Sequence, residues 1–228
     1  MNKKTMNILI IVIGVVFVGW FLYSWLPVRG IEEPAYSVVS EADGYEVREY
    51  APYIIAETTI SGATSRDDAA RKGFPIVAGY IFGDNTAKNK IAMTVPVNTE
   101  AGDSEKIAMT APVNTEKIAM TAPVNTEAED TEGTYKVSFV MPNKYTLATL
   151  PTPNDSRVEL REVPARTVAV KRFSWSSSET TFKKQETELL TALARDGVET
   201  FGASNIARYN TPWTIPFMLR NEVQIEIK

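Results

Sequence analysis

The sequence contains neither cysteine nor histidine among its 228 residues. Without cysteine there is no disulfide bond, no thiolate nucleophile, no zinc finger and no iron–sulfur cluster held by thiolates. Without histidine there is no Ser-His-Asp or Cys-His catalysis and no imidazole ligand for a metal. Carboxylate, lysine, tyrosine and threonine chemistry remains, but no spacing of these residues demonstrates a catalytic site. We therefore expect a binding protein rather than an enzyme, and we assign no catalytic or metal-binding residue.

The chain also lacks an excess of basic residues. Its 24 Lys and Arg residues stand against 28 Asp and Glu residues, a formal charge of −4. A nucleic-acid-binding domain needs a basic face, so we expect no nucleic-acid partner. Hydrophobic residues make up 44% of the chain and charged residues 23%, which is typical of a folded protein of one domain or a tightly joined pair.

One long stretch near the N-terminus lacks charge altogether. Every residue of 8–25 is uncharged, and the extended stretch 7–26 is about 30 Å long as a helix, which matches the hydrocarbon core of a bilayer. We predict that residues 1–30 form an uncleaved membrane anchor. Lys3 and Lys4 precede it, which favours a cytoplasmic N-terminus and a domain on the periplasmic or extracytoplasmic side. A cleaved signal peptide is the alternative, but the run ends in aromatic residues rather than an A-x-A-like site.

The rest of the chain contains a faint internal repeat. Residues 46–56 and 159–169 both alternate apolar and polar side chains around a proline, the pattern of two strands joined by a bend. Each is followed by a stretch with helical spacing of apolar residues, 65–80 and 178–195, which begins at a serine suited to cap a helix and ends before a glycine. Chance similarity would have to reproduce the order of the elements and the proline positions, so we favour a duplication.

Two further strands are predicted after each helix. They are residues 91–96 and 135–141 in the first half, and 206–212 and 222–227 in the second. The plan is a β-β-α-β-β unit that occurs twice. Two such units predict an α+β fold, with a distorted antiparallel sheet or open barrel and two helices, preceded by the membrane helix. We assign residues 36–228 to this one domain.

A sharper repeat lies in the middle of the chain. The string KIAMTVPVNTE at residues 90–100 recurs as KIAMTAPVNTE at 106–116 and again at 117–127. In each copy the Ile, the Met and the distal Val alternate, so we expect them on one face of a half-buried strand. Because the duplicated unit needs only one such strand, we expect residues 98–133 to be a repeat-expanded loop, at a cost of about 0.6 kcal/mol per doubling of loop length. The alternative is that the copies compete for a single strand position.

The string KIAMTAPV resembles the signature of the SOUL family of haem-binding proteins. The resemblance extends over about residues 36–228, apart from the surplus copies. Its other motifs are Tyr45–Tyr50, Gly73-Phe74, residues 80–83, Val137–Pro142, Asn210–Pro212 and Arg220–Val223. The fold of that family, a duplicated β-α-β unit that forms a distorted antiparallel barrel with two helices, agrees with the repeat. The membrane segment lies outside the family core and indicates a membrane-anchored, bacterial-type member.

Haem is the ligand that this resemblance implies. In some members a histidine of the Tyr-Glu-Val-Arg motif is the proposed axial ligand of the iron, and that position is Glu49 here. Other members are thought to hold a tetrapyrrole in a shallow apolar groove along the first helix of the domain, where basic side chains meet the propionates. The corresponding positions are Arg71, Phe74, Val77 and Ala78.

The missing imidazole and thiolate bear directly on any iron held here. Tyrosinate is a remaining oxygen ligand for ferric iron, and Tyr45, Tyr50 and Tyr80 are candidates that nothing in the sequence separates. We therefore expect weak and reversible binding of haem or a related tetrapyrrole, without a His or Cys axial ligand.

Other interpretations of the same residues stay open. Phe74, Val77 and Ala78 at helical spacing also fit simple core packing, and the methionines of the three copies fit packing better than iron ligation. The duplicated architecture also resembles bacterial effector-binding domains, which take up hydrophobic and often cationic small molecules. A buried carboxylate, with Glu49 as the first candidate, would suit such a cation. A partner-docking domain without catalysis, whose protein partner is unknown, is the remaining alternative.

Overall fold

The computed structural model describes residues 2–25, 30–87, 115–129 and 131–228. Within these ranges the chain forms three α-helices, eleven β-strands and one 3-10 turn. In chain order they are α1 (Lys3–Trp25), β1 (Tyr36–Ala42), β2 (Tyr45–Tyr50), β3 (Tyr53–Ile60), α2 (Arg66–Phe82), β4 (Asn85–Thr86), β5 (Val124–Ala128), β6 (Tyr135–Val140), β7 (Thr152–Pro153), β8 (Glu159–Val163), β9 (Arg166–Phe173), α3 (Glu179–Arg195), β10 (Thr200–Arg208), η1 (Pro216–Met218) and β11 (Asn221–Ile227).

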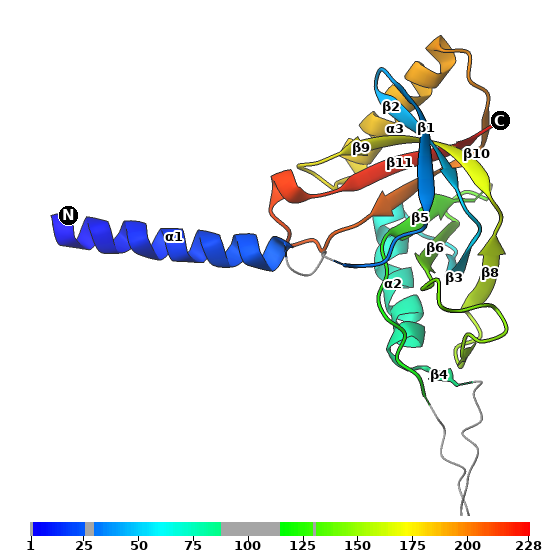
Figure 1. Ribbon diagram of the computed structural model, residues 1–228, viewed down its shortest axis with the longest axis horizontal. Coiled ribbons are helices and arrows are strands. Elements are labelled where there is room, and N and C mark those ends of the chain that lie inside the picture. Colours follow the sequence, from blue (N-terminus) through cyan, green and yellow to red (C-terminus); the bar gives the residue numbers. More distant parts are fainter. Residues whose placement is uncertain (1, 26–29, 88–114, 130) are drawn as a thin grey trace, which may run out of the picture.

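Nine of these strands form one antiparallel sheet (Figure 1). The strand order is β1-β2-β9-β11-β10-β5-β6-β3-β8, and β4 pairs with β7 in a separate two-stranded ladder. Since β1 and β8 stand at the two ends of the order, the sheet is open rather than a closed barrel. The predicted α+β class, with an N-terminal apolar helix ahead of the domain, is confirmed.

The strand order has the form that two similar halves would give. In the first half β6 lies between β3 and β5, and in the second half β11 lies between β9 and β10. The remaining pair of strands crosses over, because β2 pairs with β9 and β8 pairs with β3. This arrangement interlocks the halves in one sheet. Descent from a duplicated gene segment stays a prediction.

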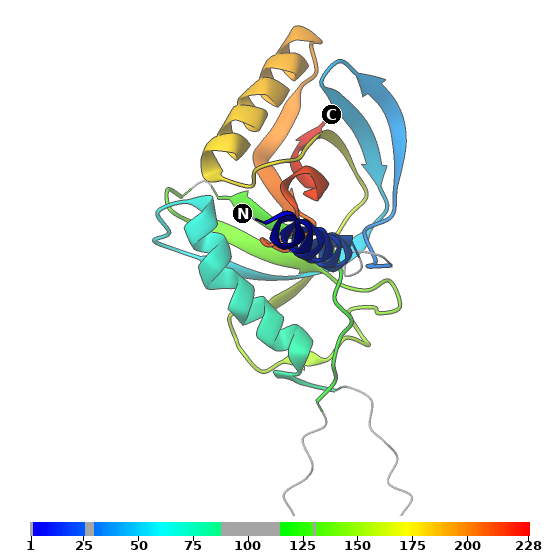
Figure 2. The ribbon, with the colours of Figure 1, turned by 90° about the vertical axis from the view of Figure 1, so that its left-hand side faces the viewer.

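Helices α2 and α3 lie on the same face of the sheet (Figure 2). Ile206 of β10 packs in the core cluster under α3 and is paired across strands with Thr126 of β5. Thr126 is in turn paired with Val137 of β6, which packs against Ala69 of α2. Because cross-strand partners share a face, both helices cover one apolar face of the sheet. The opposite face is free for other contacts.

The helix boundaries follow the predicted capping signals. Ser65 and Ser178 are the N-caps of α2 and α3, and each side-chain oxygen accepts a hydrogen bond from the backbone N–H three residues on. Gly83 ends α2 with φ of 120°, a conformation that favours glycine. The predicted starts and stops of both helices are confirmed.

The third copy of the repeat supplies the strand next to β6. Its last residues form the start of β5, whereas 91–96 and the rest of the first two copies, up to residue 114, lie outside the described residues. The predicted alternation is wrong for this copy: Ile118 is buried, but Met120 is exposed. The reason is that the residues before Val124 run alongside the sheet without strand pairing, apart from a single bridge between Thr121 and Glu32.

Helix α1 contains the predicted membrane-spanning stretch. It is 23 residues long and its side chains are exposed along almost the whole length, with Ser24 as the buried residue. Its length and hydropathy are sufficient to cross a membrane. In Figure 1 it projects away from the domain, and its C-terminal end meets the domain beside η1.

Candidate functional site

The positions implied for tetrapyrrole binding lie on α2, and the helix divides them between two faces. Arg71, Phe74 and Ala78 follow one another at spacings of three and four residues, and Phe82 continues the row by another four. Phe74 is 41% exposed, and Phe82 and the guanidinium of Arg71 are also exposed, whereas Ala78 lies buried between the two phenylalanines. We call these four residues the α2 stripe. The stripe offers apolar surface beside one basic side chain.

Two of the implied positions do not join this stripe. Val77 is fully buried in the core cluster with Phe139 and Ile81, so it packs the helix against the sheet instead of lining a groove. Glu49 is exposed on β2, a strand that pairs with β1 and β9, whereas α2 packs on β3, β5 and β6. Glu49 is therefore not a buried carboxylate, so that expectation is wrong, and it does not lie beside the helix that carries the other implied positions.

The stripe fits the apolar and anionic parts of a tetrapyrrole. The ring of Phe74 stands 5.3 Å from that of buried Phe139, so it is held in place by the core while part of its surface faces outward. The guanidinium of Arg71 is occupied by an ion pair of 3.7 Å with Asp68 on the same helix, and such an exposed pair is weak. Arg71 can therefore turn towards a carboxylate of a ligand at little cost.

The candidate tyrosine ligands do not present a free oxygen. The hydroxyls of Tyr45 and Tyr80 donate to Asp196 and to the carbonyl of Pro151, and that of Tyr50 accepts from Arg48. All three rings are buried. Burial raises the pKa of each hydroxyl, to about 12 for Tyr50, which opposes the tyrosinate form. An iron on the α2 stripe would have no ligand from these residues.

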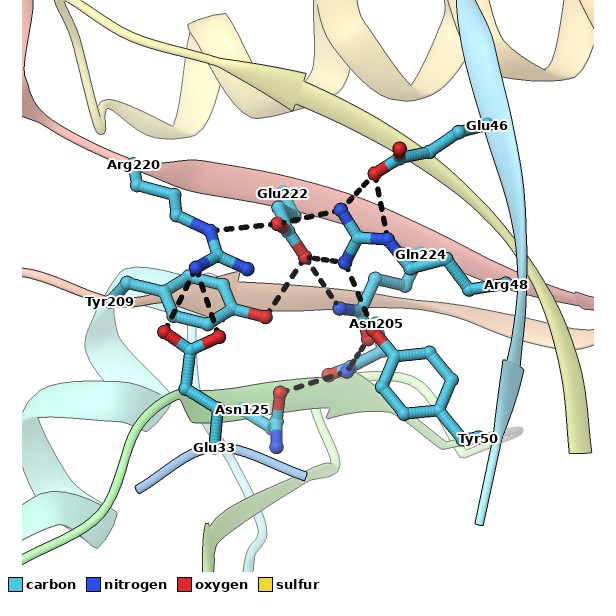
Figure 3. A network of polar contacts seen from close by, with 10 residues as sticks. All are labelled: Glu33, Glu46, Arg48, Tyr50, Asn125, Asn205, Tyr209, Arg220, Glu222 and Gln224. Carbon is cyan, nitrogen blue, oxygen red and sulfur yellow. Dashed lines mark hydrogen bonds and ion pairs between the residues drawn. The ribbon is translucent and has the colours of Figure 1, made fainter. Parts of the chain in front are cut away.

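The two flanking motifs of the family resemblance meet in a buried polar network (Figure 3). Arg48, from the Tyr45–Tyr50 motif, donates to both oxygens of Glu222, from the Arg220–Val223 motif, at 2.9 and 3.1 Å. Arg48 also donates to Glu46, and its guanidinium lies 4.3 Å from the centre of the Tyr36 ring. Arg48 and Glu222 are almost completely shielded from solvent. The motifs therefore hold β2 to β11 through the sheet face that the helices leave free.

Glu222 is the centre of this network. Besides Arg48, its carboxylate accepts hydrogen bonds from Arg220, Tyr209 and Gln224 at 2.9–3.0 Å. Burial alone would raise the pKa of Glu222, but the hydrogen bond from Arg48 and the charge of Arg220 outweigh it and hold the pKa below its usual value. The carboxylate stays ionised and fully engaged, so the network is a structural feature with no free oxygen for a ligand.

The network extends towards α1 and towards the first half of the sheet. Arg220 donates through Nη1 to both carboxylate oxygens of Glu33 at 2.9 Å, and its guanidinium stacks 3.7 Å from the centre of the Tyr209 ring. On the other side Gln224 accepts from Asn205, which also donates to Asn125 of β5. These contacts were not predicted from the sequence. The only signal for them in the sequence is that Arg48 and Glu222 belong to two motifs of the family resemblance.

A cavity lies on the helix-free face of the sheet. It measures about 200 Å³ and is lined by residues of β3, β5, β6, β8 and the second half of the sheet. Its charges are balanced, because Glu57, Glu127 and Glu226 face Lys136, Arg161 and Arg166. Arg161 pairs with Glu57 at 2.8 Å and Arg166 with Glu226 at 3.7 Å. Ligand pockets usually measure about 300–1,000 Å³, so this cavity is too small for a tetrapyrrole.

A cationic ligand would suit a buried carboxylate, the role considered above for Glu49. Among the carboxylates that line this cavity, Glu127 fits that role best. Burial raises the pKa of Glu127 more than the charge of Arg166 lowers it. No ion pair closer than 4 Å is formed by Glu127 among the residues described here. Glu127 therefore offers a cation a partly buried carboxylate, which the exposed Glu49 does not.

Comparisons with known proteins agree with this fold. The model of the family described as SOUL heme-binding protein matches residues 31–226. Heme-binding protein 2 of Mus musculus is 26% identical over 206 residues, which cover 86% of this chain and 85% of that protein.

Solved structures share the architecture at lower identity. The crystal structure of the EcmrR C-terminal domain has a TM-score of 0.54 at 11% identity, and the match covers 85% of this chain and 98% of that one. EcmrR in the cryo-EM structure of its DNA complex has a TM-score of 0.53 at 10% identity, and the match covers 99% of this chain and 70% of that one. At these identities the likeness shows the fold alone.

Proposed function

Because the chain belongs to the SOUL family of haem-binding proteins, we propose that it binds haem or a related tetrapyrrole on the α2 stripe, without catalysing a reaction. The observation that carries the proposal is the row of Arg71, Phe74, Ala78 and Phe82, which sets exposed aromatic surface beside one cation. A tetrapyrrole carries a flat apolar ring and anionic propionates, and both find a partner there.

The lack of a ligand residue for iron makes the proposed binding weak and reversible. The chain has no histidine and no cysteine, and the candidate tyrosines are buried with raised pKa values. The affinity would therefore come from apolar contact and from Arg71, without an axial bond from imidazole or thiolate. Such a protein suits transfer or temporary storage of a tetrapyrrole better than oxygen or electron chemistry.

A hemin titration of the full chain in zwitterionic nanodiscs tests this proposal. We expect a saturable change of the Soret band beyond that of empty discs, because the discs themselves dissolve hemin. Phe74→Asp should weaken the binding, whereas Leu190→Asp, at a position 43% exposed on α3, should not. Arg71→Ala should also weaken the binding. Its control is Lys184→Ala, which removes a similarly exposed cation with a similarly long ion pair and should leave the binding unchanged. Spectra identical to those of empty discs would refute the proposal.

The second part of the proposal is that α1 tethers this domain to a membrane. Lys3 and Lys4 favour a cytoplasmic N-terminus, with residues 36–228 on the periplasmic or extracytoplasmic side. The absence of cysteine allows a test without background labelling. In right-side-out vesicles an impermeant maleimide should label Ser156→Cys in the domain and leave Asn2→Cys unlabelled. Labelling of Asn2→Cys alone would show that the orientation is the opposite one. Loss of protein from the vesicles would contradict the tether.

A hydrophobic cation is the alternative ligand, and Glu127 is the observation that favours it. Its carboxylate is held partly buried in a cavity that both halves of the sheet line. If this alternative holds, isothermal titration calorimetry detects binding of a small hydrophobic cation, and Glu127→Gln abolishes the binding while Glu49→Gln does not. Unchanged binding by Glu127→Gln would exclude this cavity as the site.

A further inference from the structure

Two loops beside the end of α1 contain no charged side chain. They are residues 174–178, between β9 and α3, and residues 209–219, which form the connection between β10 and β11 except for its last residue, Arg220. Trp175 is 69% exposed in the first loop, and Trp213 is 74% exposed in the second, with Phe217 also exposed. A charge-free surface with three exposed aromatic rings is unusual in a domain with 28 acidic residues.

The two loops are fastened to each other. The backbone N–H of Trp175 donates to the carbonyl of Pro216 at 2.7 Å, and the rings of Trp175 and Phe217 lie 6.2 Å apart. Trp175 has φ of 78°, a left-handed backbone conformation that is unfavourable for a large side chain. This strained conformation directs the indole outward, although nothing in the described fold covers it. We call Trp175, Trp213 and Phe217 the aromatic patch.

The loop that carries Trp213 is also bound to α1. The indole N–H of Trp20 donates to the carbonyl of Trp213 at 2.9 Å, and the N–H of Ile215 donates to the hydroxyl of Ser24 at 3.0 Å. Ser24 is the buried residue of α1, so this is where the helix docks. Figure 1 shows the same junction at the C-terminal end of the helix.

These contacts fix the depth of the patch relative to the helix. Trp20 lies five residues before the end of α1, or about 7.5 Å along the axis at about 1.5 Å per residue. The headgroup layer on each side of the hydrocarbon core is about 5–7 Å thick. If α1 crosses a bilayer with its terminal aromatic residues at the interface, the backbone of Trp213 lies within that layer.

We propose that the aromatic patch inserts into the lipid interface of the membrane that α1 spans and sets the orientation of the domain on it. This inference rests on the proposed tether. Tryptophan and other amphipathic aromatic rings favour the interface, and uncharged loops can enter it without desolvating an ion. The domain beyond residue 26 has 22 basic and 28 acidic residues, so attraction to anionic lipid is not the cause. The contact should therefore be independent of salt and of anionic lipid.

Environment-sensitive fluorescence on the full chain tests this contact. A nitrobenzoxadiazole label is placed on Phe217→Cys and, as the matched control, on Phe201→Cys, an exposed phenylalanine of β10 outside the two loops. Each variant is measured in phosphatidylcholine nanodiscs with and without doxyl lipids labelled near the headgroup. We expect a blue shift and doxyl quenching at position 217 and neither at position 201, with the same result at high salt.

The outcomes separate this inference from the tether. Equal emission without quenching at both positions, while the protein stays in the discs, would overturn the aromatic contact and leave the tether intact. Loss of the chain from the discs would overturn the tether and this inference with it. Circular dichroism of both variants ensures that a negative result does not arise from unfolding.

Discussion

At the scale of single residues, the buried pair of Arg48 and Glu222 joins two strands that are far apart in the sequence. Each charge is shielded from water, and each is satisfied by several hydrogen bonds. Replacing both partners with apolar residues would be a mild change, but removing Arg48 takes one of two arginine partners, Arg48 and Arg220, from a carboxylate that is fully buried. The pair therefore constrains how β2 and β11 sit next to β9.

We predict that Arg48→Met lowers the free energy of unfolding by about 3–5 kcal/mol, because Glu222 loses its main cationic partner inside the fold. Chemical denaturation of the full chain in detergent measures the loss. Arg157→Met is the control, since Arg157 and its partner Asp155 form an exposed pair and the change should be nearly neutral. Equal losses in the two variants would contradict a special role of the buried pair.

The pH dependence of this loss follows from the same carboxyl group. In the folded protein the pKa of Glu222 lies below its ordinary value of 4.5. Its ionised form therefore stabilises the fold fully above pH about 4.5, and this contribution is lost as the pH falls through the lowered pKa. Without Arg48 the folded-state pKa is higher. The stability difference between wild type and Arg48→Met should therefore narrow between pH 7 and pH 3.5, and a constant difference would argue against this linkage.

At the scale of elements, α2 is packed unusually closely on β6. A Cβ atom at Gly73 would stand 2.7 Å from Cβ and Cγ2 of Val137, whereas one at Gly79 would meet nothing nearer than Cβ of Asp84 at 3.9 Å. Both glycines are interior to the helix and carry the same entropic cost. The fold therefore needs a glycine at one of these positions only.

This contrast gives a paired prediction. Gly79→Ala should stabilise the protein by about 0.5–1 kcal/mol through helix propensity. Gly73→Ala makes the same gain but overpacks the contact with Val137 at a cost of about 1–3 kcal/mol, so it should destabilise the protein or at best leave it unchanged. Thermal unfolding of both variants, followed by circular dichroism, measures the two changes in stability. A clear stabilisation by Gly73→Ala would show that the helix can move off the sheet at no cost.

The tandem copies are the second feature at this scale. The third copy fills the position of β5, and Glu116 before it is held by Asn85 and Tyr145. We predict that deletion of residues 106–116 changes the free energy of unfolding by no more than about 0.6 kcal/mol, the cost of halving or doubling a loop. The deletion places Glu105 directly before Lys117, so the residue that contacts Asn85 keeps its identity. Denaturant unfolding measures the change.

Identical substitutions in the two identical copies show whether they compete for that position. Ala122 is buried in the third copy, so Ala122→Lys should destabilise the protein strongly. Ala111→Lys, the same change in the second copy, should not. If the second copy can replace the third, Ala122→Lys alone will be mild and only the double variant will unfold.

At the scale of the whole molecule, contacts between distant elements join the two halves. Arg66 at the start of α2 makes a bidentate ion pair with Glu186 of α3, with N···O distances of 3.0 and 3.2 Å, and also donates to Ser204 of β10. Together with the crossed strands β2 and β8, this contact makes the domain one cooperative unit. Helix α1 stands outside that unit, since Ser24 is its buried residue.

We therefore predict that removal of residues 1–26 leaves a folded domain. The deletion breaks the hydrogen bonds of Trp20 and Ser24, at a net cost of about 0.5–1.5 kcal/mol each. The unfolding temperature should change little, and the protein should move from the membrane fraction to the soluble one. A fragment that cannot fold in the absence of lipid would show that α1 is part of the core.

The sequence by itself determined the local elements, because the signals for them lie within a few residues. Serine caps and glycine stops set α2 and α3, alternation and prolines set β2, β3, β8 and β9, and the motif strings identified the family. It also excluded imidazole and thiolate ligands, a constraint that no structure could alter.

Only the tertiary structure decided which of the marked residues face outward. Val77 and Phe74 have the same helical spacing to their neighbours, but the sheet covers one and leaves the other exposed. Glu49 and Arg48 are adjacent in the sequence, yet only Arg48 finds a partner 174 positions away. Which repeat copy pairs with β6, and that two uncharged loops meet beside α1, likewise depend on long-range contacts. Such contacts leave no local pattern in the chain, because their energy depends on partners that folding alone brings together.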